Sequence, residues 1–516
     1  MVVDALPVRS RLAGWRLAAL WLPVLLAAGG ASATADPRAI AAGKALAVDG
    51  NPAGVAACSA CHGADGGGQA AAGIPRLAGL DATYLRAQLA AFAAGTRENA
   101  TMAPIAKAMN DQARADVAAY YASLVAPPSP PASAPKPPVA AGETIALRGD
   151  WGADIPSCAS CHSRTGRGVG AAFPAIAGQS STYILNQLEA WRSGARHDDP
   201  LGLMRTVATR LNDDQAAAVA AYYSTLPAEA TGVAAGDAPP DPAIANDEFG
   251  KVVKLGEAIF RNPAAHAAAY VGNTLTCSNC HLDAGRLANS GPMGAAYVSY
   301  PAYRMKNGHV NTFSERLQGC FRYSMNGKAP PLGDAVLVAL ESYAYVLAKG
   351  APTGGPVPGR GYPEPAKPAQ GLDFARGAAV FGAKCALCHG ADGHGKSAWG
   401  ETVFPPLWGP DSFNWGAGMG SIEHAAGFIK ANMPLGQGDS LSDQEAWDVA
   451  MFMDSHERPQ DPRFTGDVAT TRAKFHNAPM SMYGRTVAGV LLGQRSPPAG
   501  PRPSPHEAEP HGGPNP

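Results

Sequence analysis

The chain has 516 residues, of which 46% are hydrophobic and 16% charged, and its formal net charge is -1. This length accommodates three or four domains, each large enough to bury a core of its own. The composition is that of an ordinary soluble protein. Because there is no basic excess and no basic-aromatic patch, we expect no nucleic-acid partner.

The first 35 residues are typical of a secretory signal peptide. Three arginines precede the apolar run from Leu17 to Ala28, and the small residues that follow suit cleavage after Ala33 or Ala35. The run is short for a bilayer-spanning helix, so a retained membrane anchor is the less favoured alternative. We therefore expect an exported protein of the bacterial periplasm that has no membrane span after cleavage.

Eight of the nine cysteines fall in four copies of one motif. The copies read CSACH from Cys58, CASCH from Cys158, CSNCH from Cys277 and CALCH from Cys385. CxxCH is the attachment signature of c-type haem, in which both thiols form thioethers and the histidine ligates the iron. A zinc half-site or a redox dithiol is the alternative for a single copy, but four copies without a complementary CxxC favour haem.

We therefore predict four covalently bound haem c groups. The predicted attachment cysteines are Cys58, Cys61, Cys158, Cys161, Cys277, Cys280, Cys385 and Cys388. The predicted proximal iron ligands are His62, His162, His281 and His389.

A repeat around the motifs predicts one small helical domain per haem. Each motif is preceded by a helical Gly-x-x-aliphatic stretch, beginning at Gly43, Gly142, Gly256 and Gly377. In class I cytochromes c this helix packs closely against the C-terminal helix, and glycine allows that approach. Closing helices are predicted from the capping signals Asn212 with Gln215 and Ser442 with Glu445.

The predicted fold is mainly α, with four class I cytochrome c-like haem domains in tandem joined by Pro-rich linkers. The expected segments are a signal peptide 1–35, cytochrome c lobe 36–126, Pro-rich linker 127–141, cytochrome c lobe 142–228, linker 229–245, catalytic haem domain 246–352, linker 353–370, second enzyme haem domain 371–480 and disordered tail 481–516.

Methionines are available as sixth ligands in three of the four units. A haem used only for electron transfer usually has both axial positions filled, often by His and Met. Met102 and Met204 occupy equivalent positions ahead of their closing helices, and Met433 is followed by proline in the fourth unit. These three are the predicted ligands, with Met109 and Met419 as rivals.

The third unit breaks this pattern. Met293, Met305 and Met325 are available, but none lies in the expected loop, and Cys320 stands ahead of the closing helix instead. A buried free cysteine and an intermolecular disulfide are the plain alternatives for Cys320.

The surroundings of Cys320 favour a chemical role. The nearby cations are Arg304, Lys306, Arg316, Arg322 and Lys328, and Glu315 is the only acid between 304 and 328. Such cations favour a thiolate and attract a small dianion. A solvated basic face is the alternative.

Two parts of the chain resemble known families. The stretches CSNCHLDAGR, YPAYRMKNGHVNTFSERLQGCFRYSMNGKAPP, CALCHGADGHG and FPPLWGPDSFNWGAGM, which lie between 270 and about 480, are similar to the dihaem thiosulfate dehydrogenases. Residues 36–230 resemble a two-lobed dihaem cytochrome c of the kind that accepts electrons from these enzymes. The whole chain thus resembles a fusion of enzyme and electron acceptor.

The resemblance implies that His281 and Cys320 ligate the iron of the active-site haem, and His389 and Met433 that of the second. Some family members carry lysine before this methionine, where this chain has Asn432, so a switch from Met to Lys ligation is not expected. The substrate-binding residues that the resemblance implies are Arg304, Arg316, Ser324 and Lys328.

The implied reaction joins two thiosulfates into tetrathionate, reversibly, with release of two electrons. The Cys320 sulfur is expected to leave the iron or to form a transient sulfur-sulfur adduct, and the electrons to pass through the N-terminal lobes to a soluble cytochrome or a terminal oxidase. Two alternatives stay open: a haem-thiolate protein that conjugates thiosulfate to a carrier, and a tetrahaem electron carrier without substrate chemistry.

Overall fold

The computed structural model describes residues 36–127, 139–168, 171–228, 244–398 and 401–500. The expected signal peptide, most of the linkers 127–141 and 229–245, and residues 501–516 lie outside the described residues. Within the described ranges, helices dominate and the strands form two-stranded pairs. No helix in these ranges combines the length and the apolar character that a membrane crossing requires.

The first two units repeat the same order of helices. The first contains α1 (Pro37–Asp49), α2 (Ser59–His62), a 3-10 turn (Ala70–Ala72), α3 (Ala82–Ala94), α4 (Met102–Lys107) and α5 (Asp111–Ser123). The second contains α6 (Val139–Arg148), a 3-10 turn (Trp151–Ala153), α7 (Ala159–His162), α8 (Ser181–Ser193), α9 (Leu203–Arg210) and α10 (Asp213–Thr225). The motif helices α2 and α7 therefore occupy equivalent places.

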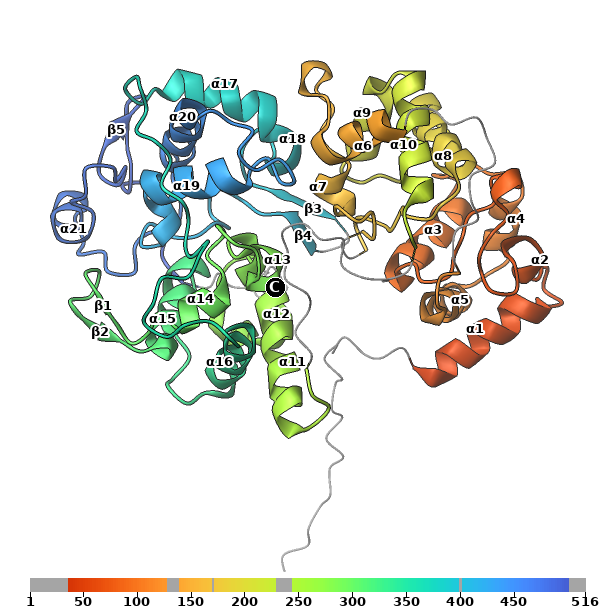
Figure 1. Cartoon of the computed structure of the whole chain (residues 1–516), viewed down its shortest axis with the longest axis horizontal. Helices are drawn as coiled ribbons and strands as arrows, with labels where there is room; N and C mark the ends of the chain where they lie inside the picture. Colours follow the sequence, from red (N-terminus) through yellow and green to blue (C-terminus); the bar gives the residue numbers. More distant parts are fainter. Residues whose placement is uncertain (1–35, 128–138, 169–170, 229–243, 399–400, 501–516) are drawn as a thin grey trace, which may run out of the picture. The chain divides into compact units, whose positions relative to one another are not determined.

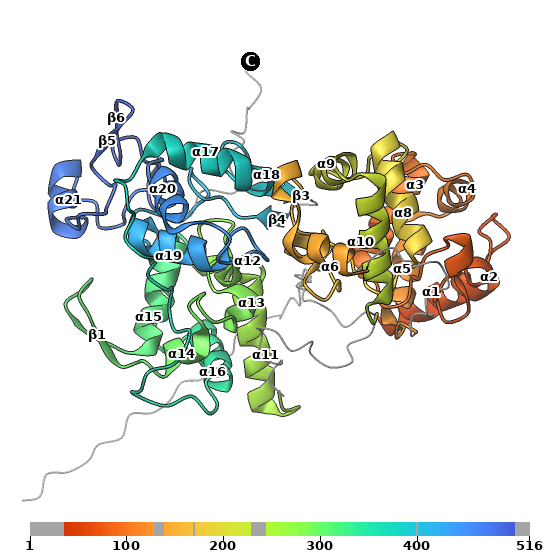
Figure 2. The same ribbon diagram turned by 45° about the horizontal axis from the view of Figure 1, so that its top comes forward.

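The third unit adds a hairpin and a π-helical turn to this plan. It contains α11 (Glu248–Arg261), α12 (Pro263–His266), 3-10 turns (Ala268–Tyr270 and Cys277–Asn279), α13 (Leu282–Gly285), α14 (Met293–Tyr297), β1 (Ala302–Arg304), β2 (His309–Asn311), α15 (Phe313–Gly319), a π-helical turn (Cys320–Ser324) and α16 (Ala335–Leu347). The β1–β2 hairpin is antiparallel, with Tyr303 opposite Val310, and projects from the neighbouring helices in both views (Figure 1, Figure 2).

The fourth unit continues past its closing helix. It contains α17 (Phe374–Lys384), α18 (Ala386–His389), β3 (Lys396–Ala398), β4 (Glu401–Phe404), a 3-10 turn (Gly418–Gly420), α19 (Ile422–Asn432), α20 (Asp443–Asp454), α21 (Val468–Phe475), β5 (Thr486–Val487) and β6 (Val490–Leu491).

In every unit the first helix packs against the last, which pairs α1 with α5, α6 with α10, α11 with α16 and α17 with α20. A Cβ added to Gly256 would lie 2.0 Å from the Ala339 carbonyl oxygen. The corresponding distances are 1.9 Å at Gly43, 2.0 Å at Gly142 and 2.2 Å at Gly377. These separations are too short for any side chain, so the predicted close approach is confirmed.

The predicted helix starts are also confirmed. The Asn212 side chain accepts from the Gln215 N–H while the Gln215 side chain accepts from the Asn212 N–H. Ser442 and Glu445 form the same reciprocal pair at the start of α20. Each pair satisfies two backbone donors that a helix N-terminus would otherwise leave open.

The third and fourth units share one hydrophobic core, whereas the first and second each have their own. The expected linker 353–370 is an ordered connection across the two units. Tyr362 donates from its hydroxyl to the Cys280 carbonyl at 3.3 Å, and Trp447 Nε1 donates to the Ala366 carbonyl at 2.9 Å. These two units therefore fold as one body.

The C-terminal segment differs from the disordered tail expected for 481–516. Residues 486–491 form the β5–β6 pair, and Figure 2 shows it beside α21. Tyr483 is 0% exposed and Leu492 is 2% exposed. Burial of these apolar side chains orders the segment. Its high content of small and polar residues gives no local sign of this burial.

Candidate haem pockets and active site

The four motif histidines make the same kind of bond. Their Nδ1 atoms lie 3.0 Å (His62 to Pro75), 2.8 Å (His162 to Pro174), 2.6 Å (His281 to Gly291) and 2.9 Å (His389 to Pro405) from a backbone carbonyl oxygen. Because Nδ1–H donates to that carbonyl, the ring is oriented and Nε2 is left for a metal. Burial lowers the pKa of all four imidazoles, that of His281 to about 4, which favours the neutral ligand form.

A cavity of about 450 Å³ is lined by the motifs of the second and fourth units. Its wall includes His162 with Met204 and His389 with Met433, among mostly hydrophobic side chains. Two thiols and an imidazole, with a thioether in the same apolar cavity, fit a covalently attached haem in each unit. Met419 also lines this cavity, so it stays a rival to Met433.

In the first unit, Met102 is the first residue of α4 and is half-buried. Its rival Met109 is 4% exposed and belongs to the hydrophobic core of this unit. Such burial is typical of a methionine that fills a core. Met102 therefore stays the predicted ligand.

A smaller cavity, of about 60 Å³, lies in the third unit and has His281 in its wall. The sulfur and hydroxyl side chains that line it are Cys277, Cys280, Cys320, Ser324, Met293, Met325 and Met419, with the Thr276 hydroxyl. This set of side chains fits a haem attached to the motif thiols, with sulfur available as a sixth ligand. The cavity does not by itself choose between Cys320 and the three methionines.

Local structure sets Cys320 apart from these methionines. Helix α15 begins with a reciprocal cap in which Thr312 and Glu315 accept from each other's N–H, and it passes into the π-helical turn at Cys320. A π turn changes the direction of the side chains that it carries and occurs frequently at functional sites.

A guanidinium lies against the Cys320 sulfur. Arg316 Nη1 donates to Cys320 Sγ at 3.0 Å. The Cys320 sulfur raises the pKa of Arg316 most strongly. Burial of the guanidinium opposes this shift, and nearby hydroxyls, including that of Tyr300, add to it. The Tyr300 hydroxyl also accepts from Arg304 Nη1 at 2.6 Å. The structure thus brings Cys320, Arg316 and Arg304 into one polar cluster beside Ser324.

Lys328 is the predicted site residue that stands apart. Its side chain is exposed and is absent from the wall of the His281 cavity, and its backbone N–H donates to the Tyr270 carbonyl at 3.1 Å. Arg322 is exposed as well. Neither cation touches the Cys320 sulfur, so the immediate site consists of Arg316 and Ser324.

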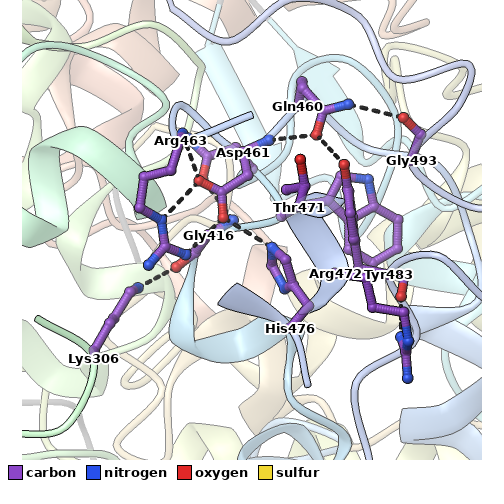
Figure 3. A network of polar contacts seen from close by, with 12 residues as sticks. Lys306, Gly416, Gln460, Asp461, Arg463, Thr471, Arg472, His476, Tyr483 and Gly493 are labelled. Atoms are coloured by element: carbon purple, nitrogen blue, oxygen red, sulfur yellow. Dashed lines mark hydrogen bonds and ion pairs between the residues drawn. The ribbon is translucent and has the colours of Figure 1, made fainter. Parts of the chain in front are cut away.

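Lys306 belongs to a polar network that the sequence did not predict (Figure 3). Lys306 is exposed as a residue, and its ammonium group donates to the Gly416 carbonyl and lies 3.8 Å from the centroid of the Tyr323 ring. Arg463, which is bound to Asp461 at 2.6 Å, lies 5.2 Å from the same centroid. Burial of the ammonium group, and then the charge of Arg463, lower the pKa of Lys306 to about 7.

Comparisons with known proteins agree with this arrangement. Three protein-family models match the chain. The cytochrome c family matches residues 40–124 and 139–227, and the SoxA/TsdA cytochrome c domain family matches residues 256–353. The family of the cbb3-type cytochrome c oxidase subunit III matches residues 372–453. A thiosulfate dehydrogenase of Thiomonas intermedia is 64% identical over 255 residues, which are 49% of this chain and 81% of that protein. The chain belongs to the thiosulfate dehydrogenase family.

The N-terminal half has relatives of its own. A thiosulfate dehydrogenase electron acceptor of Thiomonas intermedia is 49% identical over 177 residues, which are 34% of this chain and 81% of that protein. The solved thiosulfate dehydrogenase (TsdBA) of Marichromatium purpuratum is 48% identical, with a TM-score of 0.53, and the match covers 88% of this chain and 99% of that one. Class I cytochrome c domains, which carry covalent haem c, are therefore confirmed, as is the fusion of enzyme-like and acceptor-like parts.

Proposed function

We propose that this protein oxidises thiosulfate to tetrathionate in the periplasm, 2 S2O3²⁻ → S4O6²⁻ + 2 e⁻, and that it also runs the reverse reaction. The observation that carries the proposal is the 3.0 Å contact from Arg316 to the Cys320 sulfur, beside the cavity of His281. It lies within the segment that matches the SoxA/TsdA domain. Relatives of this half that are 64% and 55% identical are named thiosulfate dehydrogenases.

The chain's own residues supply binding and covalent chemistry. Arg316 presents a fork of N–H donors to the dianion, the Ser324 hydroxyl donates a further hydrogen bond, and Arg304 adds positive charge. The Cys320 thiolate bonds the sulfane sulfur of the first thiosulfate and gives Cys–S–S–SO3⁻ with loss of two electrons. A second thiosulfate then attacks that sulfane sulfur, so that tetrathionate forms and the Cys320 thiolate is released.

We infer four haem c groups, whose irons supply one-electron acceptor sites when bound. The side chains that would hold these irons are His62 with Met102, His162 with Met204, His281 with Cys320, and His389 with Met433. With haem bound, the third unit would pass electrons to the fourth and then to the two N-terminal units, toward a soluble cytochrome or a terminal oxidase. The cavity shared by the motifs of the second and fourth units supports this order.

The test is tetrathionate formation by the purified haem-loaded protein with thiosulfate and an artificial electron acceptor. The wild type should form tetrathionate, and Cys320→Gly should lose this activity. Met305→Ala, at a side chain that is 92% exposed, is the control and should keep it. Full activity of Cys320→Gly would contradict the role of this sulfur.

The matching family model also covers SoxA, which gives one alternative a specific basis. That alternative is a haem-thiolate protein that conjugates thiosulfate to a carrier protein. It predicts no tetrathionate without the carrier, whereas a tetrahaem electron carrier predicts no turnover with any sulfur anion. The same assay, run with the purified chain alone, separates the proposed function from both alternatives.

A further inference from the structure

The π-helical turn of Cys320 ends on carbonyl groups that find no partner within it. The Met325 N–H donates to the Cys320 carbonyl and the Gly327 N–H donates to the Phe321 carbonyl, both at 2.9 Å. The next three carbonyls belong to Arg322, Tyr323 and Ser324. The end of a helix leaves such groups to be satisfied from elsewhere.

The partners come from two asparagines, one of them in the fourth unit. Asn414 donates from Nδ2 to the Arg322 carbonyl at 3.0 Å and from its backbone N–H to the Tyr323 carbonyl at 3.2 Å. Asn273 Nδ2 donates to the Ser324 carbonyl at 2.9 Å. All three open carbonyls of the turn are therefore satisfied by asparagine.

The Asn414 amide is fully buried and its orientation is fixed. Its exposed fraction is 0%. Nδ2 makes a second bond, to Asn326 Oδ1 at 3.1 Å, and Oδ1 accepts from the Gly416 N–H at 3.0 Å. Because each amide atom is engaged, no other residue type reproduces this set of donors and acceptors at the same size.

The residue before Asn414 connects the same segment to both cavities. Phe413 lies in the wall of the His281 cavity and also in the wall that includes His389. Asn273 ties the segment down, since its Nδ2 also donates to the Ser412 carbonyl at 3.1 Å. Residues 412–416 thus clamp the Cys320 turn from the neighbouring unit.

We propose that Asn414 is a positioning residue that holds the π-helical turn so that the Cys320 sulfur stays directed into the His281 cavity. Sulfur ligation in the third unit then depends on a residue of the fourth. This inference rests on the proposed role of Cys320 as an iron ligand. It concerns the orientation of that ligand, since Asn414 is not among the residues that line either cavity.

Asn414→Asp in the full haem-loaded chain is the sharpest test. The substitution keeps the shape but places a carboxylate oxygen against the Arg322 carbonyl and Asn326 Oδ1, which are both acceptors. The fraction of ferric protein that shows the low-spin thiolate signal in electron paramagnetic resonance should fall to about half or less. The turnover number should fall about tenfold. KM for thiosulfate should change less than about twofold, because Arg316, the proposed substrate-binding residue, lies in α15 before the turn that Asn414 holds.

Gln460→Glu is the matched control. Gln460 is a buried amide of the same unit that donates to the Gly493 carbonyl at 2.8 Å and accepts from the Tyr483 hydroxyl at 3.0 Å (Figure 3), and neither partner belongs to the Cys320 turn. It should keep the thiolate signal and the turnover number. If Asn414→Asp fails to accumulate, Asn414→Ser and Asn273→Ser replace it, each removing a donor to the turn.

The outcomes separate the two proposals. A wild type without the thiolate signal would refute Cys320 ligation itself, whatever Asn414 does. A wild type with the signal, and Asn414 and Asn273 variants that keep it in full, would refute only the positioning role. Equal losses in Gln460→Glu and Asn414→Asp would also overturn it, because they would mark general destabilisation.

Discussion

Arg316 Nη1 lies 3.0 Å from the Cys320 sulfur, the atom on which the proposed mechanism depends. One N–H of the guanidinium is directed at the sulfur, and the others stay available to an anion that binds beside it. A lysine at this position would offer a single charged centre and no planar fork. Under the proposed function, Arg316 therefore has two simultaneous partners, the protein sulfur and the substrate.

Arg316→Lys is expected to raise KM for thiosulfate about tenfold or more, because the bidentate contact to the dianion is lost. Steady-state assays of tetrathionate formation measure this change. Arg322→Lys, at an exposed arginine on the following turn, is the control and should leave KM unchanged. An unaltered KM in Arg316→Lys would show that the guanidinium does not bind the substrate.

Under the proposed function, we expect Lys306 to make substrate binding depend on pH. Its pKa is lowered to about 7, first by burial of the ammonium group. The charged groups that face it are Arg463, Asp461, Arg316 and Arg304, with the Tyr323 ring beside them. A lysine with a lowered pKa is charged below that pH and neutral above it, so the positive charge at the site declines as pH rises through about 7.

KM for thiosulfate should therefore rise several-fold between about pH 6 and about pH 8.5, with a smaller change in the turnover number. Lys306→Arg should remove this dependence, because arginine stays charged over the whole range. The measurement is KM and the turnover number as functions of pH for both proteins. Identical pH profiles would exclude Lys306 as the titrating group.

At the scale of elements, the first and last helices of each unit cross in close contact. In the third unit, a Cβ on Gly256 would lie 2.0 Å from the Ala339 carbonyl oxygen and 2.8 Å from the Tyr343 Cβ. Neither neighbour can move without shifting α16. The crossing of α11 and α16 therefore depends on the absence of a side chain at this residue.

Gly256→Ala should lower the free energy of unfolding by about 1–3 kcal/mol, the range typical of an overpacked core. Denaturant unfolding followed by circular dichroism measures it. Gly382→Ala is the matched control, because Gly382 lies within α17 and a Cβ there would meet nothing within 4 Å. The control should be neutral or more stable by up to ~1 kcal/mol, and equal losses in both variants would refute the packing argument.

These elements also show which features of the structure can be predicted from the sequence. The crossing glycines and the capping pairs at Asn212 and Ser442 are local signals, and the structure bears each of them out. The clamp by Asn414 has no local signal, because it joins residues that lie 92 positions apart. Order in the C-terminal segment was missed for the same reason, since Tyr483 is buried by contacts with distant parts of the chain, such as Trp415.

At the scale of the whole molecule, the two halves of the chain differ in how their hydrophobic cores are built. The first and second units each bury a small core, whereas the third and fourth contribute Phe321 and Phe413 to a common one. Backbone bonds from Asn289 and Gly291 to the segment 353–370 reinforce that union. The enzyme-like half should therefore open as one cooperative unit.

Hydrogen exchange followed by mass spectrometry tests this cooperativity with the Gly256→Ala variant. If the two units unfold together, the substitution in α11 should speed exchange equally in α16 (Ala335–Leu347) and in α20 (Asp443–Asp454), although α20 belongs to the other unit. Helix α10 (Asp213–Thr225), which lies in a separate core, should exchange at the wild-type rate. Faster exchange in α16 with an unchanged α20 would mean that the units open independently. The turn that carries Cys320 would then open without the segment that clamps it, whereas a shared transition keeps ligand and clamp together until the whole body unfolds.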